Sequence, residues 1–213
     1  MNIEGIREMI ANSVASERSS HGLAKLIIKS SKVSGQPLDM NGANVICEIV
    51  INYIEQVPRY MEEGMKYAEK MGLAEEVGQM MSELEFYWFQ EEDLIPDYLG
   101  LIGITDDAYA SMYLLQSLSD YCSEMYGHPL MNADYTDANQ FIRNIIGDEI
   151  ASLLEQKVAN TIRSSFNNRA VSELYDNIFT SNFRFPESND NYISQFTHDI
   201  GINYQFGAMG VMG

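Results

Sequence analysis

Apolar side chains recur every three or four positions through most of the chain, which is the spacing of one face of an α-helix. The stripe is clearest over residues 41–89, 105–122 and 136–166. Before residue 183, no segment sustains the alternation of apolar and polar positions that is typical of a half-buried strand. This pattern predicts an all-α protein, an irregular multi-helix bundle.

Proline, glycine and capping residues predict where these helices begin and end. Pro58 fits the first position of a helix, so the first stripe is expected to divide there, and Gly72 is expected to end the second helix. Thr105 precedes two aspartates and is expected to cap a helix that ends before Gly127. Residues 136–166 carry an unbroken apolar face and predict one helix of about eight turns.

Changes in composition divide the chain into three predicted parts. Residues 1–36 predict a helical arm that packs less firmly than the rest, and residues 30–37, with their Ser, Gly and Pro, predict the linker that follows it. Residues 37–182 predict the helical core domain, which closes with a short helix over 170–179. Residues 183–213 have no helical period and are rich in Asn, Ser, Gly and aromatic side chains. They predict a non-helical tail that wraps the core, with a β-hairpin as the alternative.

The chain is strongly acidic, with a net charge of −18 that is concentrated in its middle. Residues 37–140 contain twenty acidic and three basic side chains, whereas residues 1–36 contain three acidic and five basic ones. Such a field repels phosphate backbones, so nucleic-acid binding is not expected. It favours a protein partner with a basic surface, or a divalent cation. The simpler interpretation is that acidic helix faces keep the protein soluble.

Cysteine usage and the absence of long apolar runs indicate the compartment. Cys47 and Cys122 lie far apart and have no CxxC or CxxH neighbour, which is typical of buried thiols in a reducing environment. The first residues lack the basic and apolar regions of a secretory signal, and no apolar run is long enough to span a bilayer. We therefore expect a cytoplasmic protein with no transmembrane segment. A homo-oligomer remains an option that the sequence does not decide.

Residues 87–109 combine features that predict a tight helical hairpin. An aromatic helix end that contains Trp88 is followed by Asp-Leu-Ile-Pro-Asp at 93–97, then by an apolar stretch and Asp-Asp-Ala at 106–108. Asp93 is suited to cap the turn and Pro96 restricts φ, while Gly100 and Gly103 permit left-handed backbone or close packing. Trp88 could anchor a partner, although a lone tryptophan beside other aromatic residues is more often part of the core.

This segment resembles the YkvA-like family, a domain of unknown function. The resemblance covers about residues 83–118 and departs from the family pattern at Gly100, where proline is common. It implies a small helical domain with no established reaction, and structural or partner-binding roles for the hairpin residues. Members of the family often lie beside membrane-spanning segments, which suggests a peripheral membrane role as a third functional class. The residues that carry the match are Asp93, Leu94, Ile95, Pro96, Asp97, Gly103, Asp106, Asp107 and Ala108.

Four aspartates of the hairpin offer a choice between a metal site and a structural role. Asp93, Asp97, Asp106 and Asp107 could converge as oxygen ligands for Mg²⁺ or Ca²⁺ and activate water for hydrolysis. In the structural interpretation they cap helices and complement helix dipoles, and no cofactor is required. No His, Lys or Glu-x-x-His stands nearby to complete a catalytic set, so we favour the structural interpretation.

Two classes of function follow. The first is a non-catalytic acidic helical interaction protein, such as an adaptor, an inhibitor or an immunity-type factor. The second is a divalent-metal-dependent hydrolase that uses the aspartates of the hairpin. No nucleophile elbow, zinc-binding HExxH, P-loop or dinucleotide-binding motif is present. The three histidines are isolated from one another, so a base or metal role is only a weak alternative for each; they are His21, His128 and His198.

Overall fold

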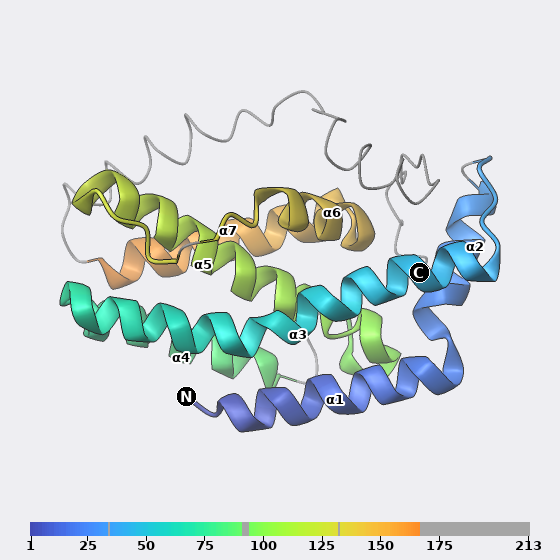
Figure 1. The fold of residues 1–213 in the computed structure, drawn as a ribbon, viewed down its shortest axis with the longest axis horizontal. Helices are drawn as coiled ribbons and strands as arrows, with labels where there is room; N and C mark the ends of the chain where they lie inside the picture. The colour runs from blue at the N-terminus through green and yellow to red at the C-terminus, as the bar shows by residue number, and fades with distance from the viewer. Residues whose placement is uncertain (34, 91–93, 132, 167–213) are drawn as a thin grey trace.

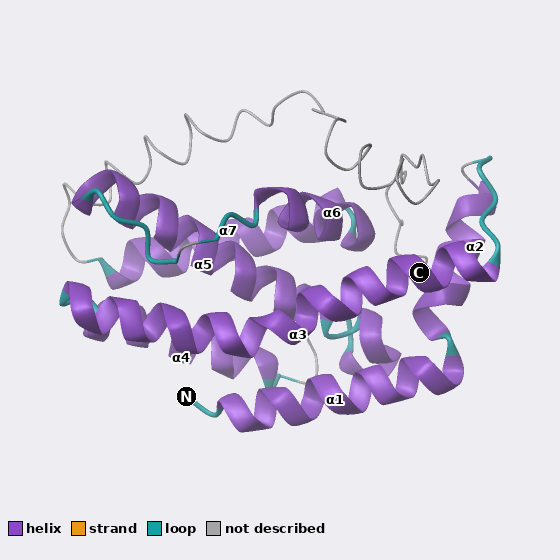
Figure 2. Ribbon diagram, viewed as in Figure 1, coloured by secondary structure: helices purple, strands orange, loops and turns teal. Residues whose placement is uncertain are grey.

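The computed structural model describes residues 1–33, 35–90, 94–131 and 133–166. Over these residues the chain forms seven α-helices and one 3₁₀-helix, with no strand, which confirms the predicted all-α bundle (Figures 1 and 2). The predicted helix over 170–179 and the predicted tail over 183–213 lie outside the described residues. The elements are α1 (Ile3–Ser20), α2 (Gly22–Val33), α3 (Met40–Met71), α4 (Ala74–Trp88), η1 (Asp97–Ile102), α5 (Thr105–Tyr126), α6 (Thr136–Ile146) and α7 (Asp148–Ser165).

Helix α5 lies at the centre of the bundle. It packs against α3, α4, α6 and α7, and nearly every residue from Thr105 to Cys122 is buried. Its polar residues are mostly small, so the helix has no solvent-facing stripe over these turns. These four helices bury apolar side chains against α5, which makes α5 the element that joins them (Figure 1).

The first two helices are integral to the core, which corrects the prediction of a loosely packed arm. Ile6 and Ile10 of α1, and Leu23 and Ile27 of α2, are buried within the same apolar cluster as α3 and α5. Helix α2 packs along α3, while α1 lies against both α3 and η1. Most polar side chains of this region lie on its outer faces, and the apolar stripe was enough to dock both helices.

Helix α3 continues through Pro58, so the predicted division there is wrong. Pro58 has no N–H to donate to the carbonyl of Ile54, yet both residues are buried in the core and the helix runs on to Met71. Tertiary packing on both sides of the proline holds the backbone helical. The predicted end at Gly72 is confirmed, because this residue caps the helix in the left-handed conformation, with φ of 74°.

The predicted helix over residues 136–166 is two helices, α6 and α7, separated at Gly147. This glycine has φ of 90° and ψ of 150°, a backbone conformation essentially restricted to glycine. Across the break, Arg143 of α6 forms ion pairs with Asp148 and Glu155 of α7. The apolar stripe remained continuous because both helices bury the same side against α5, and periodicity alone therefore concealed the break.

Among the described residues, no helix combines the length and the apolar character that crossing a bilayer would require.

Candidate functional site

The predicted hairpin exists, with η1 as the connection between α4 and α5. Pro96 precedes η1 with φ of −55° and ψ of 132°, and its carbonyl accepts a hydrogen bond from the Leu99 N–H at 3.0 Å. The carbonyl of Gly100 accepts bonds from the N–H groups of Gly103 and Ile104, at 3.0 and 3.4 Å. These bonds form a compact turn that directs the chain into α5. The start of the turn, including Asp93, lies outside the described residues.

Both glycines of the hairpin are required by its geometry. Gly100 has φ of 74° and ψ of −130°, which marks a kink within η1. Gly103 lies so close to the start of the turn that a Cβ atom there would be 2.7 Å from the Pro96 carbonyl oxygen and 2.8 Å from the Asp97 Cα. Because both obstacles are backbone atoms, a larger residue would push the turn open. The role that we predicted for these glycines is confirmed.

Two of the four predicted aspartates are fully buried. Asp106 and Asp107, the second and third residues of α5, are 0 and 1% exposed, and Asp97 in η1 is half-buried. The Tyr87 hydroxyl donates to Asp106 Oδ2 at 3.2 Å. The two carboxylates lie at the positive end of the α5 dipole, which stabilises negative charge. The predicted cap by Thr105 is wrong, because its hydroxyl donates backward to the Leu101 carbonyl at 2.7 Å.

The described residues do not by themselves assemble the predicted metal site. Within 1–33, 35–90, 94–131 and 133–166, no group of three or more His, Cys, Asp and Glu side chains is arranged to hold a metal ion. The structure brings Asp106 and Asp107 together on one helical turn and places Asp97 on the neighbouring turn behind Gly103. Asp93, the fourth predicted ligand, is not among the described residues, so metal binding stays a prediction.

Trp88 is a core residue that connects the two helices of the hairpin. Its side chain is completely buried, and its indole N–H donates to the Ser111 hydroxyl of α5 at 2.9 Å. That hydroxyl in turn donates to the Asp107 carbonyl at 2.8 Å. Trp88 therefore positions α4 on α5, and its side chain does not reach the surface to contact a partner.

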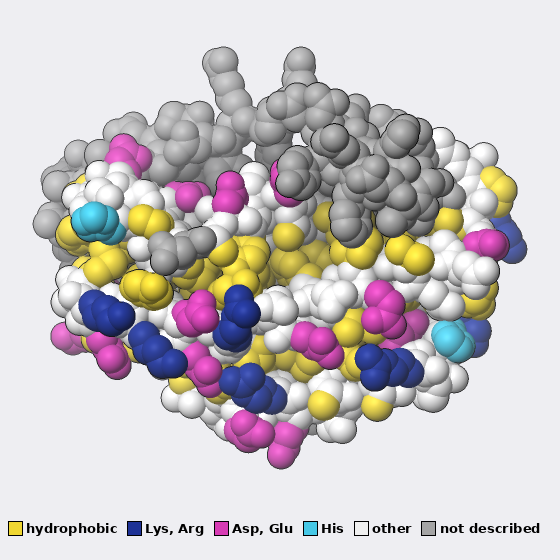
Figure 3. Space-filling view, viewed as in Figure 1, with side chains coloured by type: hydrophobic (Ala, Val, Ile, Leu, Met, Phe, Trp, Pro, Cys, Tyr) yellow, Lys and Arg dark blue, Asp and Glu magenta, His cyan; other side chains and the backbone are white. Residues whose placement is uncertain are grey.

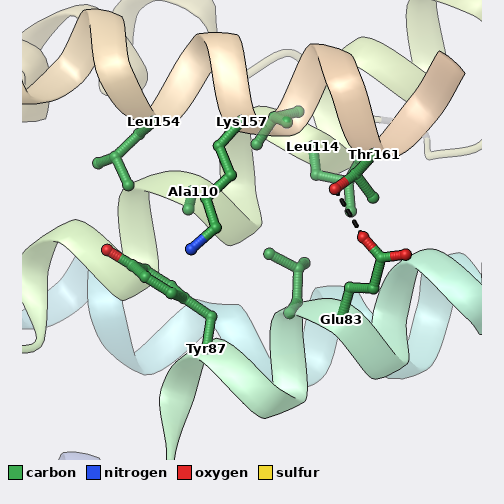
Figure 4. Close-up of a pocket in the computed structure, with 9 residues that line it drawn as sticks. Glu83, Tyr87, Ala110, Leu114, Leu154, Lys157 and Thr161 are labelled. Atoms are coloured by element: carbon green, nitrogen blue, oxygen red, sulfur yellow. Dashed lines mark hydrogen bonds between the residues drawn. The ribbon is translucent and has the colours of Figure 1, made fainter. Parts of the chain in front are cut away.

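The structure contains a cleft, not predicted from the sequence, where α4 faces α7. Its inner part reaches α5 and is lined by apolar side chains, and its outer part is an open hollow of about 400 Å³. Glu83, Tyr87 and Lys157 line both parts (Figure 4). The apolar residues of the inner part are Leu84, Ala110, Leu114, Leu154 and Val158.

Polar contacts hold the two sides of the cleft in place. Lys157 extends from α7 so that its Nζ lies 3.8 Å from the centroid of the Tyr87 ring, a cation–π contact (Figure 4). The hydroxyl of Thr161 donates to Glu83 Oε2 at 2.7 Å. Tyr87 thus forms part of the wall of the cleft and also bonds to the buried Asp106. The cleft and the aspartate hairpin are consequently linked through one side chain.

Phe86 lines the outer part of the cleft, and its exposure could have been predicted from the sequence. The apolar stripe of α4 passes through Val77, Met81, Leu84 and Trp88, and Phe86 lies outside that spacing. In the structure Phe86 is 73% exposed. An aromatic residue off the stripe of an amphipathic helix is expected on the surface, so periodicity could have identified it.

Helix α4 differs in charge from the surface seen in Figure 3. That view shows acidic and basic side chains interspersed over one face of the molecule. Helix α4 instead contains four glutamates and no basic residue. It therefore combines a local excess of negative charge with an exposed aromatic side chain beside a hollow.

Other reactive groups of the described residues are held in the interior. The Tyr109 hydroxyl donates to Glu155 Oε1 at 2.6 Å, and Arg143 pairs with the same carboxylate, so a buried network joins α5, α6 and α7. Cys47 and Cys122 are buried as predicted; burial raises the pKa of Cys47 to about 12 and that of Cys122 to about 11. Both thiols are therefore protonated and unreactive near neutral pH.

Comparison with known proteins adds no relative: no protein-family model, no curated protein and no solved structure matches this chain, and the resemblance to the YkvA-like family remains a prediction based on the hairpin residues alone.

Proposed function

We propose that this protein is a non-catalytic interaction protein, an adaptor, inhibitor or immunity-type factor, that binds a protein partner with a basic surface. The observation that carries the proposal is the surface of α4, which has no basic residue and where the exposed Glu75 and Glu83 accompany an exposed Phe86 beside a cleft. Aromatic side chains supply much of the binding energy at protein interfaces, and complementary charge accelerates and directs association.

The test is to identify a partner and measure how its affinity depends on charge. Partners would be captured in the source cells by cross-linking, and each candidate would then be purified and titrated against this protein. We expect a basic partner whose affinity falls as NaCl is raised and falls again when the exposed Glu75 and Glu83 of α4 are replaced by glutamine. Glu4→Gln and Glu8→Gln in α1 serve as the matched control for loss of charge elsewhere.

Two outcomes would contradict the proposal. In one, the purified partner is acidic or neutral and its affinity does not respond to salt. In the other, the charge variants of α4 and of α1 weaken binding of the partner equally. The glutamates of α4 would then act only through the net charge of the protein.

A second candidate function is binding of a divalent metal at the hairpin. The observation that favours it is the complete burial of two adjacent carboxylates, Asp106 and Asp107, because buried charges are either paired or bound to metal. Asp97, on the neighbouring turn, would be a further oxygen ligand of the kind that Mg²⁺ and Ca²⁺ prefer.

Calorimetric titration with Mg²⁺, Ca²⁺ and Mn²⁺ tests this candidate. Micromolar binding that is lost in Asp97→Asn and Asp107→Asn, but kept in the exposed helix cap variant Asp39→Asn, would support a metal site. If no metal binds and the hairpin variants only unfold more easily, the aspartates are structural.

A further inference from the structure

We propose that the outer face of α2 docks on the surface of an anionic phospholipid membrane, with its lysines against the lipid phosphates and its exposed aliphatic side chains in the headgroup region. This inference goes beyond the proposed function, because it concerns a different surface of the molecule. It does not depend on a protein partner at α4.

The outer face of α2 carries cations and apolar side chains side by side. Lys25, Lys29 and Lys32 are exposed and form one stripe along the helix. Leu26 and Val33, which are 42 and 84% exposed, lie two turns apart and form the adjacent stripe. This combination is typical of a helix that lies in a membrane interface, because its aliphatic side chains enter the headgroup region while its basic side chains contact anionic lipid.

The positive charge of this face is not neutralised within the protein. Residues 18–38 contain four Lys and Arg side chains and no acidic one, although the chain has a net charge of −18. The carboxylates at the two ends of this stretch act as helix caps, because Glu17 accepts the Leu23 N–H and Asp39 accepts the Gly42 N–H, both at 2.8 Å. Among the described residues, none of the four cations forms an ion pair. They are therefore available to an external anion.

The core holds this face outward. Leu23 and Ile27 bury the opposite side of α2, and the Ser31 hydroxyl accepts the Leu38 N–H at 2.9 Å, which fixes the connection to α3. Figure 1 shows α2 and this connection at one end of the long axis of the molecule. A membrane can approach this end while the rest of the bundle extends away from it. Exposed charges separated by more than about 8 Å are largely screened at physiological ionic strength, which limits repulsion by the remote acidic residues.

The exposed aliphatic side chains favour lipid over other anionic partners. Nucleic acid would contact the lysines through its phosphates but would leave Leu26 and Val33 without an apolar environment. A second copy of this chain is disfavoured, because two molecules that each carry a charge of −18 repel one another. An acidic protein is the alternative that the experiment distinguishes.

The experiment is co-sedimentation of the full-length protein with phosphatidylcholine vesicles that contain about 30 mol% phosphatidylserine, a lipid that supplies the anionic surface. Vesicles of phosphatidylcholine alone are the neutral control. We expect binding to the anionic vesicles that falls as NaCl is raised. The triple variant Lys25→Gln/Lys29→Gln/Lys32→Gln should lower the partition coefficient about a hundredfold, because each lysine near an anionic surface contributes about a fivefold gain.

A second triple variant controls for the loss of net charge. Lys66→Gln/Lys70→Gln/Lys157→Gln removes three exposed cations from α3 and α7, and its partition coefficient should stay within about twofold of the wild type. Both triple variants alter exposed side chains, so their thermal unfolding followed by circular dichroism should match that of the wild type.

The aliphatic contribution is tested by a separate pair of variants. Val33→Ser should lower the partition coefficient about threefold, because less apolar surface leaves water at the membrane. Leu153→Ser is its control, since Leu153 is 48% exposed on α7 and should not contact the lipid.

Four outcomes would overturn the proposal. They are no sedimentation with anionic vesicles, equal sedimentation with neutral vesicles, equal losses in the two triple variants, and equal partition of wild type and Val33→Ser. Titration with soluble poly-glutamate identifies the alternative. If the lysines of α2 are needed for binding of poly-glutamate while vesicles do not sediment the protein, the face belongs to an acidic protein. The vesicles contain no protein, so none of these results bears on the proposed partner of α4.

Discussion

At the scale of single residues, buried polar groups connect elements that the sequence does not show to be neighbours. Glu17, near the end of α1, is only 5% exposed, and its carboxylate accepts the N–H groups of Leu23 and Ala24 at 2.8 and 3.2 Å. It therefore caps α2 from the preceding helix, across the bend at His21, where φ is 53°. Periodicity alone would not identify Glu17 as a cap, because its partners depend on the angle between two helices.

Replacement of Glu17 by alanine should lower the free energy of unfolding by about 2 kcal/mol, since it removes a buried helix cap together with a charge at the positive end of α2. Urea denaturation followed by circular dichroism measures the change. Glu8→Ala, an exposed position on α1, is the control and should change stability by less than about 0.5 kcal/mol. Equal effects of the two variants would show that the cap contributes nothing.

At the scale of elements, the pattern of apolar positions predicted most helices correctly but misplaced two boundaries. The ends at Gly72 and Gly127 were predictable, because each glycine directly follows the last apolar position of its helix. Pro58 suggested a break that tertiary packing prevents, whereas Gly147 makes a break that the continuous stripe concealed. Local signals therefore decide a boundary only where the packing on both sides does not override them.

Two glycines should be intolerant of a side chain for different reasons. Gly103→Ala forces the turn of η1 apart and should cost about 2 to 3 kcal/mol. Gly147→Ala places a Cβ in a backbone region that other residues avoid and should cost about 1 to 3 kcal/mol.

Gly78→Ala supplies the control for both glycine variants, and the same urea denaturation applies. Gly78 lies inside α4, and its nearest neighbour to an added Cβ would be a methionine methyl group at 3.7 Å. The alanine should therefore raise stability by up to about 1 kcal/mol through helix propensity. Unchanged stability in Gly103→Ala would mean that the turn adapts without cost.

At the scale of the whole molecule, the sequence predicted the fold class but not the cleft. Helical periodicity and a single set of apolar faces are enough to indicate an all-α bundle. The cleft depends on how α4 meets α7, and the hydrogen bond between Thr161 and Glu83 joins residues that lie 78 positions apart. Local sequence patterns do not indicate which residues so far apart in the chain come into contact, so the cleft could not be predicted from them.

Buried tyrosines distributed through the bundle should make its stability fall at high pH. Burial raises the pKa of Tyr53, raises that of Tyr109 together with the nearby Glu155, and raises that of Tyr121 to about 12. The unfolded chain loses these protons near pH 10 while the folded chain keeps them. Because the folded state then binds more protons, the free energy of unfolding decreases as pH rises above about 10.

The measurement for this prediction is the urea midpoint at about pH 8 and about pH 10.5. Tyr109→Phe should reduce the difference between the two midpoints, because it removes one of the groups that must remain protonated. Tyr98→Phe alters an exposed tyrosine and should leave the difference unchanged. A wild-type midpoint that does not move with pH would contradict the expected role of the buried tyrosines.

The central position of α5 has a consequence for synthesis on the ribosome. Helices α1 to α4 are translated first, and α3 and α4 both pack against a helix that does not yet exist at that stage. The parts of their apolar faces that α5 covers stay exposed until residue 126 has emerged, and α7 must follow before the far side of α5 is closed. We therefore expect nascent chains that end before α5 to require chaperones and to aggregate when released early.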